Sequence, residues 1–327
     1  MDAAGAVRFN STVSLRSHHA LVAIDLGRIR ANAAAIRGRT GVPVWAVVKA
    51  DAYGLGIGPV ARALAGVVDG FCVFDLAEAV EADLWRTTGK PAIAIGPPSS
   101  FDPAPYLEHH VRPAVHTVEQ AKGLSRARPI LCVDTGMQRF ACPPEQADEV
   151  LRAGEIDEAF THAATAQQAH RLVERLGGRG LRLHAAASSL LDDPACRLDA
   201  VRPGLALYHG AVRVSVPLFE VRQTRGPAGY TAFAAPRHGV IPVGYAHGLR
   251  PGPCLVNGRP SRIIETGMQS AYVQTEAGDR SGDPVVLLGD VPAPEQIAAS
   301  WGTSPHEALL RLAGVGRRQY RGVQARV

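Results

Sequence analysis

The 327-residue sequence predicts an α/β fold: an N-terminal (β/α)8, TIM-like barrel over residues 20–214 and a C-terminal mainly β domain over residues 215–327, to which residues 1–19 also belong. Two observations lead to this fold. Between about residues 44 and 208, short apolar runs alternate with amphipathic stretches, and the runs recur about every 20–25 residues, as strands with crossover helices do. After about residue 215, strand-like runs lie instead between turns rich in glycine and proline. The spacing favours a closed barrel over an open doubly wound sheet.

Eight apolar runs are expected to form the barrel strands, because polar or turn-forming residues bound each of them. They are VWAVVK (44–49), GFCVF (70–74), AIAIG (92–96), VRPAV (111–115), ILCVD (130–134), AFTHA (159–163), LRLHA (181–185) and, less regularly, VRPGLALY (201–208). In the C-terminal part we expect strands in GVIPVGYA, PSRIIETG and DPVVLLG, with one helix near 305–313. The run LVAIDL (21–26) is compatible with either domain.

The composition excludes several classes of protein. No apolar run approaches the roughly 18–20 residues of a membrane span, and the first twenty residues lack the apolar stretch of a secretory signal. The five cysteines are scattered without a CxxC pair, which favours a cytoplasmic protein without a disulfide framework or zinc site. The net charge of +5 is dispersed along the chain, so a nucleic-acid partner is not expected, although the charge can attract an anionic ligand.

Lysine is scarce in this chain. Lys49, Lys90 and Lys122 are the only lysines, whereas 32 of the 35 basic residues are arginines. A desolvated lysine amine can form a Schiff base, and an arginine cannot, because its guanidinium stays protonated. Lys49 closes the first predicted strand, at the end of a barrel where active sites form.

Other reactive side chains fall at the same end of the predicted strands. They are Arg139 after the fifth strand, His162 at the end of the sixth, His184 and Ser188 after the seventh, and Arg202 with Gly204 on the eighth. Because the carboxyl ends of the strands meet at one face of a barrel, the sequence predicts an active site there.

The segment AVVKADAYGLG (46–56) resembles the segment of alanine racemases that carries the lysine bound to pyridoxal 5′-phosphate (PLP), with Leu55 in place of the usual histidine. Further similar segments follow in the family's order, and they cover nearly the whole chain: VAIDL (22–26), VDTGMQRF (133–140), FTHAATA (160–166), LHAAASS (183–189), VRPGLALYHG (201–210), IPVGYAHG (241–248), ETGMQ (265–269) and GDPVVLLG (282–289). The resemblance implies a PLP-binding barrel, a C-terminal β domain and a homodimer with shared active sites. It also implies that the protein interconverts L- and D-alanine.

The resemblance assigns a role to each residue of the cofactor site. Lys49 would hold PLP as a Schiff base, and Arg202 would face the pyridine nitrogen, where its fixed charge disfavours protonation of the ring and makes it a weaker electron sink. A barrel decarboxylase would instead set a glutamate there. The phosphate would be bound by Tyr53, Ser188 and the backbone N–H groups of Gly204 and Leu205, and His162 would support the cofactor or Arg202.

Racemisation needs a base on each face of the substrate, and the family takes the second one, a tyrosine, from the partner subunit. Alignment without gaps from Tyr245 puts Gly226 at that position, whereas a four-residue deletion puts Tyr230 there. We favour Tyr230, because AGYTAF matches the family's local pattern and a turn-rich connection tolerates shortening. Arg139 would orient the substrate carboxylate or the catalytic tyrosine, and the backbone N–H of Met268 would bind the same carboxylate.

The chain departs from the family mainly around the substrate. The differing residues are Leu55 (usually His), Cys132 (Lys), Gln138 and Phe140 (Gly and Leu), Gln167 and His247 (Asp), Ala187 (Asn), Glu265 (Arg), Gln269 with Ser270 (Asp-Gln) and His306 (Tyr). Glu265 reverses a charge at the expected substrate entrance, which makes a substrate with a cationic side chain conceivable. Two alternatives therefore stay open: a PLP-dependent racemase or lyase of different specificity, and a PLP-binding protein without turnover.

Overall fold

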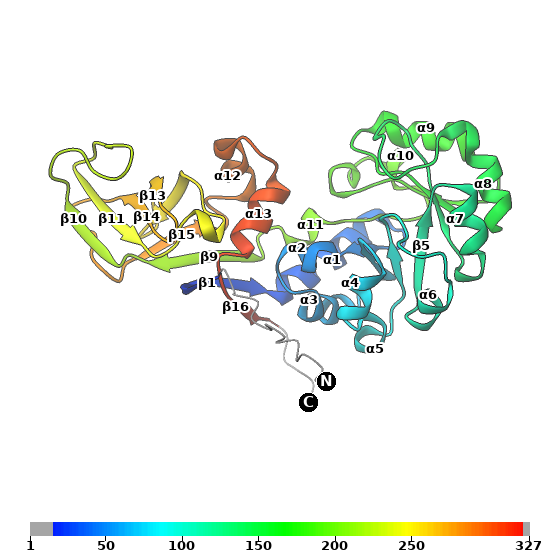
Figure 1. The fold of residues 1–327 in the computed structure, drawn as a ribbon, viewed down its shortest axis with the longest axis horizontal. Coiled ribbons are helices and arrows are strands. Elements are labelled where there is room, and N and C mark those ends of the chain that lie inside the picture. Colours follow the sequence, from blue (N-terminus) through cyan, green and yellow to red (C-terminus); the bar gives the residue numbers. More distant parts are fainter. Residues whose placement is uncertain (1–15, 323–327) are drawn as a thin grey trace, which may run out of the picture.

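The computed structural model describes residues 16–322, which form two parts: a parallel sheet surrounded by helices and a larger, mostly antiparallel sheet (Figure 1). The expected contribution of residues 1–15 to the β domain lies outside the described residues. No helix in residues 16–322 is long and apolar enough to cross a membrane.

The parallel sheet contains seven strands that neighbour one another in sequence order. All seven lie in or within one residue of the apolar runs expected from the sequence, and nearly all their residues are buried, as strands covered on both faces must be. They are β2 (Trp45–Val47), β3 (Gly70–Val73), β4 (Ala92–Ala94), β5 (Val111–Val115), β6 (Ile130–Cys132), β7 (Glu158–Phe160) and β8 (Arg182–His184).

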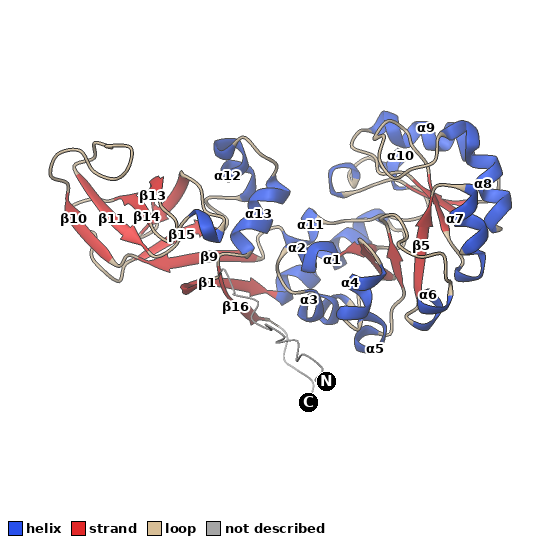
Figure 2. Cartoon of the chain, viewed as in Figure 1, coloured by secondary structure: helices blue, strands red, loops and turns tan. Residues whose placement is uncertain are grey.

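Helices separate these strands and cover the outside of the sheet (Figure 2). The longest is α1 (Leu26–Thr40), which Asp25 caps by accepting a hydrogen bond from the backbone of Arg28. The others are α3 (Ile57–Leu64), α4 (Leu76–Glu81), α5 (Leu84–Thr88), α6 (Ala104–Glu108), α7 (Val118–Gly123), α8 (Ala147–Gly154), α9 (Ala166–Leu176) and α10 (Pro194–Arg197).

The prediction of an eighth strand over residues 201–208 was wrong in its extent. Only Ala200 and Val201 form parallel bridges, to His184 of β8 and to Val44 ahead of β2. The backbone N–H groups of Trp45 and Val47 donate to the carbonyl oxygens of Val201 and Pro203, each at 2.9 Å, and so close the barrel. Pro203 has no N–H to continue a ladder, and the chain turns directly into the short helix α11 (Leu205–Tyr208).

The second sheet has nine strands in the order β10-β11-β14-β13-β12-β15-β9-β1-β16. Strand β1 (Ser17–Asp25) pairs antiparallel with β9 (Val212–Pro217) and parallel with β16 (Gly316–Arg321). Residues 21–25 of β1 therefore pair with β16 and Val214 of β9 pairs with β15, and the division of the chain at residue 214 stays a prediction. The other strands are β10 (Glu220–Gln223), β11 (Arg237–Ile241), β12 (Gly252–Val256), β13 (Arg259–Thr266), β14 (Ala271–Gln274) and β15 (Pro284–Leu288).

Two helices, not one, lie between this sheet and the barrel (Figure 1). Helix α13 (Pro305–Ala313) was expected. Helix α12 (Pro294–Trp301) was not, because Pro292 and Pro294 at its start indicated a turn. Pro294 occupies the first turn of α12, where a missing N–H costs nothing. Together these helices form one wall of the cavity described next.

Candidate active site

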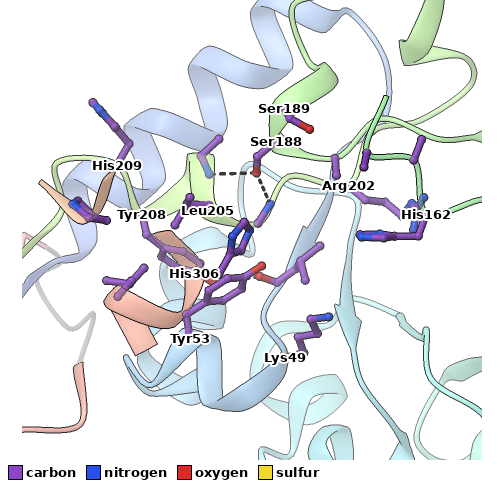
Figure 3. A pocket seen from close by; sticks show the side chains of 18 of the residues that line it. Lys49, Tyr53, His162, Ser188, Ser189, Arg202, Leu205, Tyr208, His209 and His306 are labelled. Carbon is purple, nitrogen blue, oxygen red and sulfur yellow. Dashed lines mark hydrogen bonds between the residues drawn. The ribbon is translucent and has the colours of Figure 1, made fainter. Parts of the chain in front are cut away.

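A cavity of about 450 Å³ opens at the carboxyl ends of the barrel strands, against helices α12 and α13 (Figure 3). Side chains from both parts of the chain form its walls, including Pro294, Glu295, His306 and Leu309 from the two helices. All seven residues expected at the cofactor line this cavity: Lys49, Tyr53, His162, Ser188, Arg202, Gly204 and Leu205. Tyr208, Ala163 and Ala206, which the sequence did not single out, line it as well.

Lys49 follows β2 by two residues and reaches a second, smaller cavity of about 90 Å³ that also contacts Arg139, His162 and Arg202. Burial and the positive charge of Arg139 lower the pKa of Lys49, and burial with the charges of Arg202 and Lys49 lowers the pKa of His162 to about 4. A lowered pKa makes the neutral amine of Lys49, the form that acts as a nucleophile or a base, more accessible than it is for a lysine in water.

The turn after Lys49, α2 (Lys49–Tyr53), has left-handed backbone. Residues 50–53 have φ angles of 54–58°, and Gly54 continues the turn with φ of 79°. Left-handed helical backbone costs about 1–2 kcal/mol per residue that carries a Cβ. Glu78 Oε1 accepts a hydrogen bond from the N–H of Ala50 at 2.7 Å, and Asp51 Oδ1 accepts one from Ile57 at 2.8 Å. These contacts hold a strained reversal that directs Tyr53 into the cavity.

Hydroxyl and N–H groups converge at the end of the cavity opposite Lys49 (Figure 3). Ser188 Oγ accepts hydrogen bonds from the N–H groups of Gly204 and Ala206 at 3.0 and 3.1 Å. A Cβ on Gly204 would lie 2.2 Å from the hydroxyl oxygen of Tyr53, so only glycine allows this approach. Burial raises the pKa of Tyr53 to about 12, which keeps its hydroxyl a donor. The rings of Tyr53 and His306 are 5.9 Å apart, which brings His306 to the same end.

Arg202 is buried, with its guanidinium 4.5 Å from the centre of the Phe160 ring. One terminal nitrogen donates to the carbonyl of Thr161, whereas Nε has no hydrogen-bond partner among residues 16–322. A buried N–H without an acceptor costs about 1–3 kcal/mol, so a ligand that supplies an acceptor gains from the contact. The unprotonated nitrogen of a pyridine ring is such an acceptor. The residues present therefore fit PLP.

Behind Arg202 lies a buried carboxylate, Glu158, that was not predicted from the sequence. Glu158 lies 3.1 Å from Nε2 of His184 and 2.6 Å from the guanidinium of Arg112. Burial alone would raise the pKa of Glu158, but His184 and Arg112 lower it to about 2. Burial lowers the pKa of His184 to about 4, against the opposing attraction of Glu158. In the sequence, the one indication of this site is that Glu158 stands at the start of the otherwise apolar strand β7.

The structure does not bring Tyr230 or Met268 to Lys49 of the same chain. The two side chains are 86% and 61% exposed, and neither lines the cavity. The loop between β10 and β11, which contains Tyr230, lies at the end of the molecule away from the barrel (Figure 1). Arg139 does lie with Lys49, in the smaller cavity.

The expectation that Glu265 lines a substrate entrance was wrong. Its side chain is buried, and its carboxylate accepts hydrogen bonds from the N–H groups of Tyr230 and Thr231 at 2.8 and 2.7 Å. A carboxylate that is bound in this way offers no free charge to a substrate. The charge reversal in the sequence therefore does not indicate a cationic substrate.

Comparison with known proteins agrees with this geometry. A family model for the N-terminal domain of alanine racemase matches residues 24–212, and one for its C-terminal domain matches residues 227–320. An alanine racemase of Pectobacterium atrosepticum is 31% identical, and the alignment covers 83% of this chain and 90% of that protein.

Solved structures show the same fold. The alanine racemase of Streptomyces coelicolor superimposes with a TM-score of 0.81 at 27% identity, over 94% of this chain and 98% of that one. An alanine racemase of Bartonella henselae with covalently bound pyridoxal phosphate gives a TM-score of 0.81 at 23% identity, over 93% of this chain and 100% of that one. The fold and the resemblance found in the sequence are thus confirmed, and the chain belongs to the alanine racemase family of PLP-dependent isomerases.

Proposed function

We propose that this protein interconverts L- and D-alanine with PLP, using Lys49 on one face of the substrate and Tyr230 of the partner subunit on the other. The main support for this proposal is one cavity that is lined by both Lys49 and Arg202. The pKa of Lys49 is lowered, and the Nε–H of the buried Arg202 has no acceptor among the described residues. Such a site suits a ligand with a carbonyl carbon at one point and a ring nitrogen at another.

The donors around the cavity match the groups of PLP. Lys49 would bind it covalently, and Tyr53, Ser188 and the N–H groups of Gly204 and Leu205 would bind its phosphate. Bound PLP withdraws electrons from the substrate's Cα and so makes its proton acidic. Arg202 keeps a positive charge beside the ring nitrogen, which disfavours a second positive charge there and restrains side reactions.

The proton transfers would use two side chains, one from each subunit of a homodimer. The neutral amine of Lys49 takes a proton from Cα on its own face, and the protonated amine returns one there in the opposite direction of the reaction. Tyr230 of the partner subunit would serve the opposite face, where its phenolate takes a proton and its phenol returns one. Arg139, beside Lys49, and the backbone N–H of Met268 would hold the substrate carboxylate, so that Cα stays between the two bases.

A homodimer supplies the second base in this proposal. Tyr230, Tyr245 and Met268 expose 86%, 55% and 61% of their surface, which is unusual for large apolar side chains. A two-fold interface that inserts these side chains into the partner's cavity would cover them and complete both sites. We also propose a cytoplasmic location, because all five cysteines are unpaired and buried.

The test is deuterium exchange at Cα, with the PLP-loaded enzyme in D₂O and a panel of single-enantiomer amino acids. We expect exchange with inversion, fastest for alanine, and borohydride reduction should attach the cofactor to the peptide that carries Lys49. The Lys49→Ala variant should lose at least about 10³-fold in rate, since it lacks both the covalent attachment and one base. Lys122→Ala, at an exposed position of α7, is the matched control.

Other outcomes would contradict specific parts of the proposal. Faster inversion of another amino acid would reject alanine as the substrate. Exchange with retention of configuration alone would reject the second base. Bound PLP without exchange on any amino acid would reject turnover altogether.

A further inference from the structure

Glu265, near the end of β13, is a buried carboxylate that serves one short turn. Glu265 is only 6% exposed. Oε1 accepts a hydrogen bond from the N–H of Tyr230, and Oε2 accepts from both the N–H and the hydroxyl of Thr231. Three donors from two consecutive residues therefore converge on one carboxylate, 34 and 35 positions away in the sequence.

The turn is also closed at its base. Ala228 and Phe233 exchange both backbone hydrogen bonds, at 2.8 and 3.1 Å. Phe233 is buried, and its ring packs 5.1 Å from the ring of Tyr272. Gly229 has φ of 71°, and a Cβ there would lie 2.6 Å from Glu265 Oε1. The hydrogen bonds to Glu265 and those between Ala228 and Phe233 therefore fix the backbone of residues 228–233, whereas Tyr230 remains 86% exposed.

The local sheet geometry places the carboxylate under the turn. The pairing of β13 with β14 shifts register between Ile263 and Glu265, and such a shift redirects the side chains that follow it. Removing a carboxylate from water costs several kcal/mol unless hydrogen bonds replace the water. Burial raises the pKa of Glu265, but the bonds from Thr231 and Tyr230 outweigh that effect and leave it below its usual value. The carboxylate is therefore charged, and its bonds to the turn are charge-assisted.

We propose that Glu265 is a positioning residue for Tyr230: its carboxylate fixes the backbone of the 229–231 turn, so that the phenol enters the partner's site in one orientation. This inference rests on the proposed role of Tyr230 as the second base. An exposed turn would otherwise lose conformational entropy each time the base is brought into line, and a misplacement of about 1 Å can cost 10²-fold in rate.

The test uses the PLP-loaded enzyme with Glu265→Gln, which keeps the shape but replaces an acceptor oxygen by an NH₂ that faces donors. The matched control is Glu276→Gln, which removes an exposed carboxylate from the same part of the chain. For Glu265→Gln we expect kcat for inversion to fall about 10- to 100-fold with KM changed less than about 2-fold. Deuterium exchange with retention at the Lys49 face should stay within about 2-fold of the parent, because Lys49 is unaffected.

A second readout does not depend on catalysis. Amide hydrogen exchange of the peptide that spans residues 228–233 should accelerate at least about 10-fold in Glu265→Gln and remain unchanged in Glu276→Gln. Unchanged amide exchange, an unchanged inversion rate, or an equal fall of inversion and retention would each overturn the positioning role. Tyr230→Phe separates the two proposals: if it keeps full inversion, Tyr230 is not the second base, whereas if it loses inversion and Glu265→Gln does not, only the positioning role fails.

Discussion

At the scale of single residues, the barrel contains buried ionisable groups whose protonation is coupled to folding. His184 is 1% exposed, and burial lowers its pKa to about 4, although Glu158 opposes the shift. A histidine in the unfolded chain takes up a proton near pH 6.5. The unfolded state therefore binds more protons than the folded state between these two values, and the free energy of unfolding decreases as the pH falls through this window.

We predict that His184 adds up to about 1.4 kcal/mol per pH unit to this decrease, the limit for one proton. The free energy of unfolding by urea, measured at saturating PLP between pH 6.5 and 4.5, should decrease less steeply in His184→Asn than in the parent protein. His170→Asn, at an exposed position of α9, should keep the parent slope. Glu158 contributes little over most of this range, because its stabilising effect is lost mainly between its unfolded pKa of about 4.3 and its folded pKa of about 2. Equal slopes in all three proteins would show that His184 is not neutral when folded.

The residues of the cavity could be predicted from the sequence, but their supporting contacts could not. Lys49, His162, Ser188 and Arg202 follow recognisable strands, and parallel strands bring their carboxyl ends together. Glu158 and Glu265 act on residues of other strands and turns, so their partners depend on register and side-chain direction. Glu265 shows the difficulty. Its residue type suggested a charge at the substrate entrance, whereas its contacts show a buried carboxylate that binds the backbone of Tyr230 and Thr231.

At the scale of elements, the left-handed turn α2 stores strain next to Lys49. Ala50 is an exposed residue at φ of 54°, where a Cβ is unfavourable and glycine is not. Ala35, in the right-handed helix α1, is exposed as well. The same substitution at these two positions should therefore have opposite effects on stability.

We predict that Ala50→Gly raises the free energy of unfolding by about 0.5–1 kcal/mol, because relief of about 1–2 kcal/mol of strain exceeds the entropy cost of glycine. Ala35→Gly should lower it by about 1 kcal/mol. Urea unfolding of both variants, with PLP held at one saturating concentration, checks the pair. A loss of stability in both would mean that the turn is not strained at Ala50.

Elements with strong apolar patterns were predictable, and elements set by tertiary contacts were not. The seven strands β2–β8 are short buried runs, and each run predicted its strand. Residues 201–208 form an equally apolar run, yet Pro203 ends the ladder and α11 begins at Leu205. Helix α12 was missed because Pro292 and Pro294 indicated a turn, although proline is also favoured in the first turn of a helix.

At the scale of the whole molecule, each active site is proposed to draw its two bases from different subunits. Lys49 lies at the barrel cavity, and Tyr230 lies on the exposed loop between β10 and β11, at the end of the molecule away from the barrel (Figure 1). A variant that lacks one base and a variant that lacks the other therefore have complementary defects.

We predict that inactive Lys49→Ala and Tyr230→Phe variants regain inversion when they form mixed dimers. One of the two sites in a mixed dimer has both bases, so isolated mixed dimers should recover about half of the parent activity. The measurement is alanine inversion by mixed dimers isolated with two affinity tags. Lys49→Ala mixed with the double variant is the control and should remain inactive. Absence of recovery in verified mixed dimers would show that the two bases are not shared between subunits.

The pairing of β1 has a consequence for synthesis of the chain on the ribosome. Strand β1 has β9 on one side and β16 on the other, and β16 begins at Gly316. The barrel strands can emerge and pair with one another while β1 still lacks a neighbour on one side, and an unpaired strand edge can associate with other chains. Contacts between residues so far apart in sequence also form slowly. Strand β16 therefore protects strand β1, which is translated long before it, and translation that stops before Gly316 leaves that edge uncovered.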